Sequence, residues 1–180
     1  LNTTAPETPL IPSVFLLGPS VLSACDNLTL DATSAKGSGG RPWTSVVWSI
    51  SPKSATVDVT ALANFMASIT TGVSSVIRVD SRLFPPNDPD PANNVFDFQV
   101  LVTNFLGETG LSFLSVTKSS NPNIPNVVVV GDAIFTVFPK DEMTVTAKGT
   151  VASCATSKEL TYEYKIYRNY VIQPTLVSTS

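Results

Sequence analysis

Residues 11–18 read IPSVFLLG and residues 124–131 read IPNVVVVG, so one pattern occurs twice in this chain. Each copy pairs isoleucine with proline, continues as an apolar run and ends on glycine. An alternating segment follows each copy, at residues 28–33 and 143–148, and an aromatic-centred segment comes after it. A fixed order of motifs that recurs indicates a repeated structural unit, and short apolar runs bounded by proline and glycine are typical of β-strands. We therefore predict a β-sandwich module that begins twice.

The composition favours strands and excludes several classes of partner. The 180 residues could form one large or two small domains, and only 14% of them are charged. Valine, serine and threonine are abundant, which favours pleated strands and predicts an all-β protein. The net charge of −3 and the pI of about 4.8 provide no basic surface for a phosphate backbone. We therefore expect no nucleic-acid partner.

Several features point to an exported protein. No apolar run approaches the roughly 18 residues that a membrane span requires, so we predict no span within this chain. The chain begins with leucine, which we interpret as a processed or excerpted product of an exported precursor. Glycosylation sequons at Asn2 and Asn27 predict covalent glycans on an extracellular or cell-surface protein.

The two cysteines, Cys25 and Cys154, lie too far apart in sequence for a local metal or redox motif. The chain has no histidine that could complete a zinc or c-type haem site. In an exported protein a disulfide is the natural use of such a pair. An intrachain bond would clamp the two modules together, whereas an interchain bond would link neighbouring subunits. Two unpaired or separately paired thiols are the third alternative.

We predict three parts along the chain: an extended segment at residues 1–10, a complete sandwich module at residues 11–120 and an incomplete one at residues 121–180. Both modules are expected to be immunoglobulin-like or fibronectin-III-like. Trp48, at the centre of an alternating strand, is interpreted as the core tryptophan of such a sandwich, and Tyr164 takes the matching place in the second module.

Helical spacing occurs at residues 57–69, VDVTALANFMASI, where apolar side chains recur at intervals of three and four. Within a sandwich this segment predicts a short crossover helix. Residues 95–105 alternate most clearly and predict a strand, followed by a hairpin turn at residues 104–110 with two glycines.

Three segments carry a resemblance to a known family: CDNLTLDAT from Cys25, GSGGRPW from Gly37 and VTNFLG from Val102. In their order and spacing they resemble the receptor-for-egg-jelly repeats related to the polycystin family. The likeness covers most of residues 11–166. It implies a large extracellular protein of tandem sandwich modules and supplies no catalytic residues. The tryptophan-aspartate-phenylalanine-glycine signature of polycystic-kidney-disease modules is absent, so that subtype is not assigned.

Direct evidence of catalysis is sparse. Without histidine the usual serine and cysteine nucleophiles lack their base, although serine-lysine and paired-carboxylate sites stay open in principle. We predict that the chain is not an enzyme and has no cofactor. The one metal candidate is calcium, at Asp88, Asp90 and Asp97 near the loop 84–94. That loop lacks the glycine and glutamate of an EF-hand, and a stiff, solvated proline turn explains it equally well.

The second module has room for only three or four strands, so it would leave apolar faces and strand edges open. The rest of a longer chain, packing onto the first module, or a strand of a neighbouring subunit could cover them. Our leading hypothesis takes the third option, with residues 1–17 (Leu10, Val14, Leu16) or the tail at residues 171–180 as the donor strand. Copies of the chain would then polymerise head to tail into a filament of structural glycoprotein. The alternative is a ligand-binding ectodomain of a receptor or adhesin that resembles the egg-jelly receptors.

Overall fold

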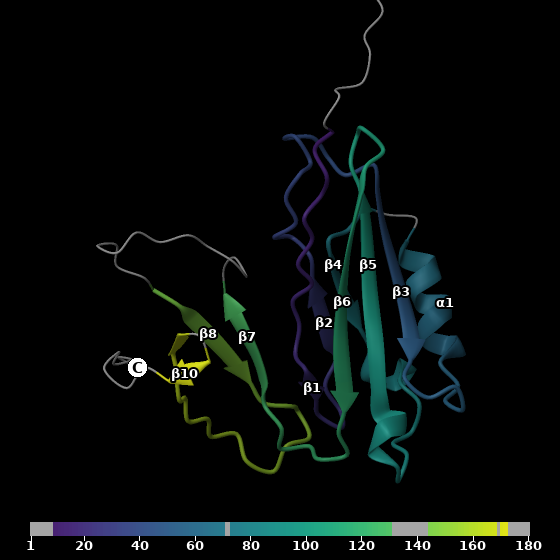
Figure 1. The fold of residues 1–180 in the computed structure, drawn as a ribbon. Coiled ribbons are helices and arrows are strands. Elements are labelled where there is room, and N and C mark those ends of the chain that lie inside the picture. The colour runs from purple at the N-terminus through teal and green to yellow at the C-terminus, as the bar shows by residue number, and fades with distance from the viewer. Residues whose placement is uncertain (1–8, 71–72, 131–143, 169, 173–180) are drawn as a thin grey trace, which may run out of the picture.

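The computed structural model describes residues 9–70, 73–130, 144–168 and 170–172. The described residues are mostly β with one α-helix, which confirms the predicted all-β class (Figure 1). In chain order the elements are β1 (Val21–Leu22), β2 (Leu28–Asp31), β3 (Ser45–Pro52), α1 (Thr60–Ile69), β4 (Val76–Val79), η1 (Ser81–Leu83), η2 (Pro91–Asn94), β5 (Val95–Thr103), β6 (Thr109–Lys118), β7 (Asn126–Val130), β8 (Thr146–Thr150), β9 (Tyr167–Arg168) and β10 (Val171–Ile172).

The first module, residues 11–120, contains two sheets that enclose one core. One sheet has the strand order β1-β6-β5-β3, with β1 parallel to β6 and the other neighbours antiparallel. The second sheet pairs β2 with β4 in antiparallel fashion. Two isolated bridges, Ser13 to Lys36 and Leu17 to Asp31, place the N-terminal segment alongside β2. The strands of this module therefore lie in two layers (Figure 1).

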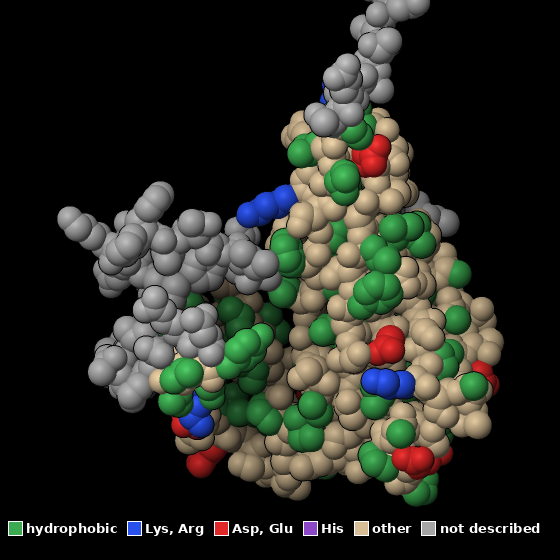
Figure 2. Space-filling model, in the orientation of Figure 1, with side chains coloured by type: hydrophobic (Ala, Val, Ile, Leu, Met, Phe, Trp, Pro, Cys, Tyr) green, Lys and Arg blue, Asp and Glu red, His purple; other side chains and the backbone are tan. Residues whose placement is uncertain are grey.

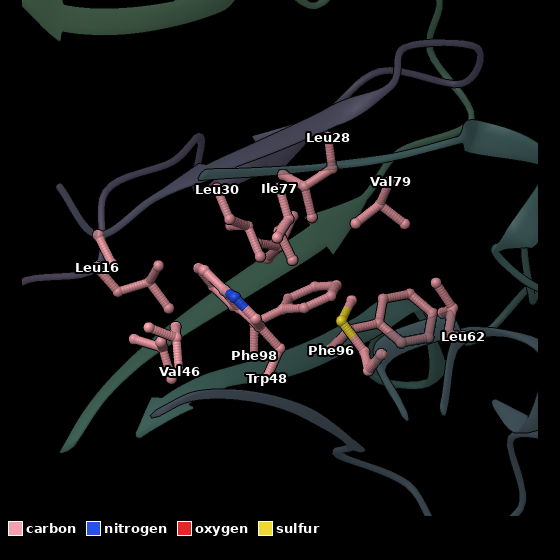
Figure 3. Packing of buried hydrophobic residues seen from close by; sticks show 14 of the residues in the cluster. Leu16, Leu28, Leu30, Val46, Trp48, Leu62, Ile77, Val79, Phe96 and Phe98 are labelled. Atoms are coloured by element: carbon pink, nitrogen blue, oxygen red, sulfur yellow. The ribbon is translucent and has the colours of Figure 1, made fainter. Parts of the chain in front are cut away.

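The centre of the core comes from β5, in which successive side chains point to opposite faces of the sheet. Its inward residues Phe96, Phe98, Val100 and Val102 are almost completely buried. Phe84 packs edge-on against Phe96, with ring centroids 5.4 Å apart. Figure 3 shows side chains of β2 and β4 facing those of β3 and β5 across this core.

Trp48 on β3 lies in the same core, where the sequence places it. Its side chain is only 3% exposed, and its indole Nε1 donates a hydrogen bond to the Ser74 carbonyl at 3.1 Å. The Trp48 backbone N–H donates to Thr70 Oγ1 at 3.3 Å. The one polar atom of the indole is thus satisfied, which allows the large ring to be buried without an unpaired donor.

Helix α1 links β3 to β4 and so carries the chain from one sheet to the other. It begins at Thr60, three residues later than the start of the predicted segment, and ends at Ile69 as predicted. Leu62 and Met66, one turn apart, are buried in the core, which explains the apolar spacing. Asp58 Oδ1 accepts a hydrogen bond from the Thr60 N–H at 2.9 Å just before the first turn.

The N-terminal segment closes the open side between the two sheets of the first module. Beyond its bridges to the β2 side, the Leu16 N–H donates to Ser112 Oγ on β6 at 3.2 Å. Val14 and Leu16 are 9% and 7% exposed and belong to the core of their own module. This corrects their assignment as donors to a neighbouring subunit, because both side chains are already packed. Leu10 is 53% exposed.

The second module, residues 121–180, is described as two small pairs of strands. β7 pairs antiparallel with β8 over five residues, and β10 pairs antiparallel with β9 over two. Residues 160–166 form no strand, and Tyr164 is 38% exposed. The prediction of Tyr164 as a core residue is therefore wrong, because its side chain is exposed.

Candidate functional site

The junction between the modules is covalent. Cys25, in a turn after β1, forms a disulfide with Cys154, which follows β8; their Cα atoms are 6.5 Å apart and 129 residues apart in sequence. The structure therefore contains the intrachain disulfide, one of the three alternatives that the sequence left open. Next to it, Asn123 Oδ1 accepts hydrogen bonds from both the N–H and the hydroxyl of Thr156, each at 2.9 Å. Covalent and polar contacts together fix the start of the second module.

The sheet formed by β7 and β8 presents exposed apolar side chains. Val127, Val128, Val129 and Val130 follow one another along β7 and are 47%, 38%, 54% and 58% exposed. Side chains of successive strand residues point to opposite faces, so both faces of this sheet carry exposed valine. A two-stranded sheet is marginally stable in water by itself. Additional strands or another surface are therefore needed to cover it.

A groove of about 370 Å³ lies between β7 and the outer side of β2. Residues 128–130 form its apolar wall, and the opposite side includes Thr29, Asp31 and Thr33. Asp31 Oδ1 accepts hydrogen bonds from the Thr33 N–H at 2.7 Å and from its hydroxyl at 2.6 Å. Figure 2 shows the recess between the two modules. One apolar wall facing hydroxyl and carboxylate groups suits a ligand with a polar and an apolar side.

The calcium candidates do not come together. The carboxylates of Asp88 and Asp90 accept backbone N–H groups within their own loop, from Asp90 at 2.8 Å and from Ala92 at 2.9 Å. Asp97 lies on β5, where its carboxylate accepts a hydrogen bond from the Ser115 hydroxyl. Within the described ranges, no group of three His, Cys, Asp or Glu side chains gathers to hold a metal ion. Asp88 and Asp90 stabilise the turns of this loop, as the solvated-turn interpretation requires.

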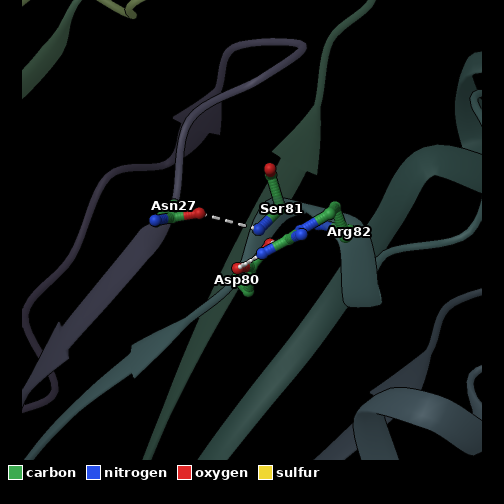
Figure 4. A network of polar contacts seen from close by, with 4 residues as sticks. All are labelled: Asn27, Asp80, Ser81 and Arg82. Atoms are coloured by element: carbon green, nitrogen blue, oxygen red, sulfur yellow. Dashed lines mark hydrogen bonds and ion pairs between the residues drawn. The ribbon is translucent and has the colours of Figure 1, made fainter.

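The side-chain amide of Asn27, in the first module's sequon, is oriented with its oxygen and its nitrogen in opposite directions. Asn27 Oδ1 accepts a hydrogen bond from the Ser81 N–H at 2.9 Å, and in Figure 4 the Nδ2 atom, where a glycan would attach, points the opposite way. Thr29, the third residue of the sequon, is exposed on β2. The side chain is therefore oriented by the hydrogen bond to its oxygen, and its nitrogen points away from that bond. The other sequon, at Asn2, lies outside the described residues.

Asp80 and Lys118 are among the ionisable groups of the first module whose pKa values are shifted. Hydrogen bonds from the Arg82 side chain and backbone lower the pKa of Asp80 to about 2, and the two side chains form an ion pair at 2.9 Å (Figure 4). Both are exposed, so the pair orients the turn after β4 and adds little stability. Burial lowers the pKa of Lys118, whose Nζ donates to the Pro85 carbonyl at 3.1 Å. None of these groups faces the groove or the β7–β8 sheet.

The sequence interpretation missed Asn104, a polar residue that is only 1% exposed. Its Nδ2 donates to the carbonyls of Leu10 at 2.6 Å and Gly37 at 3.2 Å, and its Oδ1 accepts from the N–H groups of Leu106 at 2.9 Å and Glu108 at 3.0 Å. Every hydrogen-bonding position of the amide is thus used. The only sequence signal was an asparagine at the start of the predicted hairpin turn.

No helix in the described part of the chain is long and apolar enough to cross a membrane. A comparison of the sequence with protein-family models and with curated proteins finds no match.

Proposed function

We propose that this chain is part of an extracellular structural glycoprotein whose immunoglobulin-like modules assemble head to tail into a filament. A neighbouring subunit completes the open second module by adding a β-strand. The observation that carries the proposal is the β7–β8 sheet, where four consecutive valines are each at least 38% exposed. Apolar sheet surface of this kind is either covered by another element or becomes a site of aggregation.

The topology of the first module supports the immunoglobulin-like assignment. A sheet that contains β2 and β4 faces a sheet of order β1-β6-β5-β3, and the third strand places Trp48 in the core between them. The disulfide differs from the one typical of antibody domains, because Cys25 and Cys154 join two modules instead of two sheets of one module.

The disulfide also supports an extracellular location, since such bonds persist in oxidising compartments. The orientation of Asn27, whose Nδ2 points away from the hydrogen bond to Ser81, is compatible with a covalent glycan in the same compartment. A strand donated from one subunit to the next makes a heterologous contact, and such contacts propagate into open filaments when the rotation does not close a ring. Strand addition thus links the exposed sheet to a structural role.

The test is the association state of the 180-residue chain, measured by light scattering across a concentration series and by negative-stain electron microscopy. We expect concentration-dependent growth and regular filaments. Val129→Glu places a charge on the exposed β7–β8 sheet and should return the chain to monomers. Phe113→Glu is the matched control, because Phe113 is 61% exposed on β6 of the first module. A monomer at every concentration, or assembly that only the control abolishes, contradicts the proposal.

A second function is favoured by the groove between β7 and β2. Its mixed lining supports a ligand-binding ectodomain of a receptor or adhesin, with Asp31 and Thr33 as polar contacts. Saturable binding of a glycan or a protein to the monomeric chain, weakened by Thr33→Val, is the expected result. Binding that is equally strong in this variant contradicts the groove as the site.

A further inference from the structure

The sequon asparagine, Asn27, stands at one end of the polar row that lines the groove between β2 and β7. Side chains alternate along β2: its two leucines are 0% exposed, whereas Thr29 lies on the outward face. That alternation, continued by one residue before the strand, places Asn27 on the outward face as well. Thr29, Asp31 and Thr33 line the groove. The row of groove residues therefore begins roughly 7 Å from Asn27, the distance that two strand residues span.

The hydrogen bond of the Asn27 amide directs its nitrogen toward the groove. Oδ1 accepts from the Ser81 N–H at 2.9 Å, and Ser81 follows β4, which pairs with one edge of β2. Nδ2 points the opposite way (Figure 4). On the opposite edge of β2, the Leu17 N–H donates to the Asp31 carbonyl at 2.8 Å. Leu17 and Gly18 line the groove, whereas none of the described lining residues comes from β4. A glycan on Nδ2 therefore leaves Asn27 on the groove side of β2.

The lining of the groove matches the two kinds of surface that a sugar presents. A pyranose ring carries hydroxyl groups around its rim and C–H groups on its faces. Thr29, Asp31 and Thr33 offer hydroxyl and carboxylate oxygens on one side of the groove, and residues 128–130 form its apolar wall. Val128 and Val130 point to the same face of β7 and are 38% and 58% exposed. The volume of about 370 Å³ is that of a small-molecule site. Sugars in the groove can therefore bind the polar row and cover the two valines.

We propose that the first sugars of an N-linked glycan on Asn27 lie in this groove and cover Val128 and Val130. The covalent bond forms between Nδ2 and the anomeric carbon of the first sugar. Nδ2 loses one proton, and the activated donor, a glycosyl diphosphate of the secretory pathway, releases its diphosphate with the bonding electron pair. The inference rests on the proposed function in one respect, that the chain is an exported glycoprotein. It assigns an occupant to the groove, and this glycan competes there with the ligand of the second function.

The first experiment detects the contact directly. The 180-residue chain with Asn2→Gln, in which Asn27 is the only sequon, is secreted from a cell line that adds high-mannose N-linked glycans, with its valine methyl groups labelled with ¹³C. It is studied below the concentration at which light scattering detects assembly. We expect a glycan on Asn27 by mass, and nuclear Overhauser contacts between its first two sugars and the methyl groups of Val128 and Val130. Val127, which is not among the lining residues, should show none. An unmodified Asn27, or a glycan that contacts neither valine, would overturn the proposal.

A matched pair of variants makes the test specific to the apolar wall. An endoglycosidase that cleaves between the first and second sugars acts only on glycan that has left the groove. Val128→Glu places a charge on the wall, so trimming should become at least about threefold faster, as expected if the glycan occupies the groove for roughly two thirds of the time. Val127→Glu makes the same change on the opposite face of β7 and should leave the rate unchanged. Equal trimming rates in the two variants contradict the contact.

The two proposals fail in different ways. If the chain forms filaments but the glycan on Asn27 contacts neither Val128 nor Val130, the assignment of the groove is wrong and the proposed function stands. If the glycan contacts these valines but the chain stays monomeric at every concentration, the glycan site stands and the filament proposal is wrong.

Discussion

Replacing both cysteines of the junction with alanine tests whether the disulfide holds the second module in place. When the whole chain unfolds, the bond closes a loop of 129 residues, for which chain entropy predicts a stabilisation of about 5 kcal/mol. When only the second module unfolds, the first module stays folded up to Lys118, the end of β6. The effective loop is then about 36 residues (154 − 118), and the same relation gives about 4 kcal/mol. Most of the stabilisation therefore acts on the second module.

The two modules can be followed with separate probes. Both tryptophans, Trp43 and Trp48, lie in the first module, so their fluorescence reports unfolding of that module alone. Hydrogen exchange of β7 and β8 reports the second module. In Cys25→Ala/Cys154→Ala we expect the fluorescence transition in urea to stay almost unchanged. Exchange in β7 should accelerate more than about 100-fold, as a loss of about 4 kcal/mol requires.

The control is Thr156→Ala, which removes the hydrogen bond from the Thr156 hydroxyl to Asn123 at the same junction, keeps the one from the backbone N–H and leaves the disulfide intact. Its effect on exchange should be small and correspond to about 1 kcal/mol, the contribution of a single exposed hydrogen bond. If the double cysteine variant exchanges at β7 as slowly as the unmodified chain, then noncovalent contacts hold the second module and the loop argument is refuted.

Three further predictions concern the first module. Asn104→Ala should lower the free energy of unfolding by about 2–4 kcal/mol in urea titrations, because four hydrogen bonds are lost and buried backbone groups are left unpaired. Gly110→Ala should lower the free energy of unfolding by about 1–3 kcal/mol, because an added Cβ would clash with the Pro12 carbonyl. Gly107→Ala serves as a comparison: an added Cβ there meets no neighbour, although the φ of Gly107 is +84°. Since burial lowers the pKa of Lys118, the unfolded chain binds more protons between that value and 10.5, so stability should rise with pH across this window. In Lys118→Met this rise should vanish; a persistent rise would assign it to another group.

Local patterns predicted the elements whose side chains pack within one module. The alternation at residues 95–105 corresponds to β5, and the helical spacing at 57–69 corresponds to α1, because both place apolar side chains in the same core. Trp48 was identified for the same reason: an aromatic residue at the centre of an alternating strand has a facing sheet to pack against. In these segments the period of the pattern and the packing agree.

Features that depend on distant segments could not be predicted. Val14 and Leu16 were assigned to an intermolecular strand, since nothing near them in sequence shows that their segment lies between two sheets. Gly110 was expected to lie in the hairpin turn at residues 104–110. It lies instead in β6, where the close approach of the Pro12 backbone excludes a side chain. Tyr164 was placed in a core by analogy with Trp48, but it lies in a segment that forms no strand and its side chain is 38% exposed.

The exposed valines of the second module limit how strongly one donated strand can bind there. Burying a valine completely is worth about 1.5–3 kcal/mol, and Val127, Val129 and Val145 are 47%, 54% and 41% exposed, so together they offer about 2–4 kcal/mol. Association of two free molecules costs at least about 4 kcal/mol. Edge hydrogen bonds, each worth about 1 kcal/mol net, must therefore supply the surplus, and a free strand binds weakly. A strand held close by a neighbouring subunit acts at an effective concentration of about millimolar. Complementation is therefore favoured within an assembly, where each new contact positions the next strand.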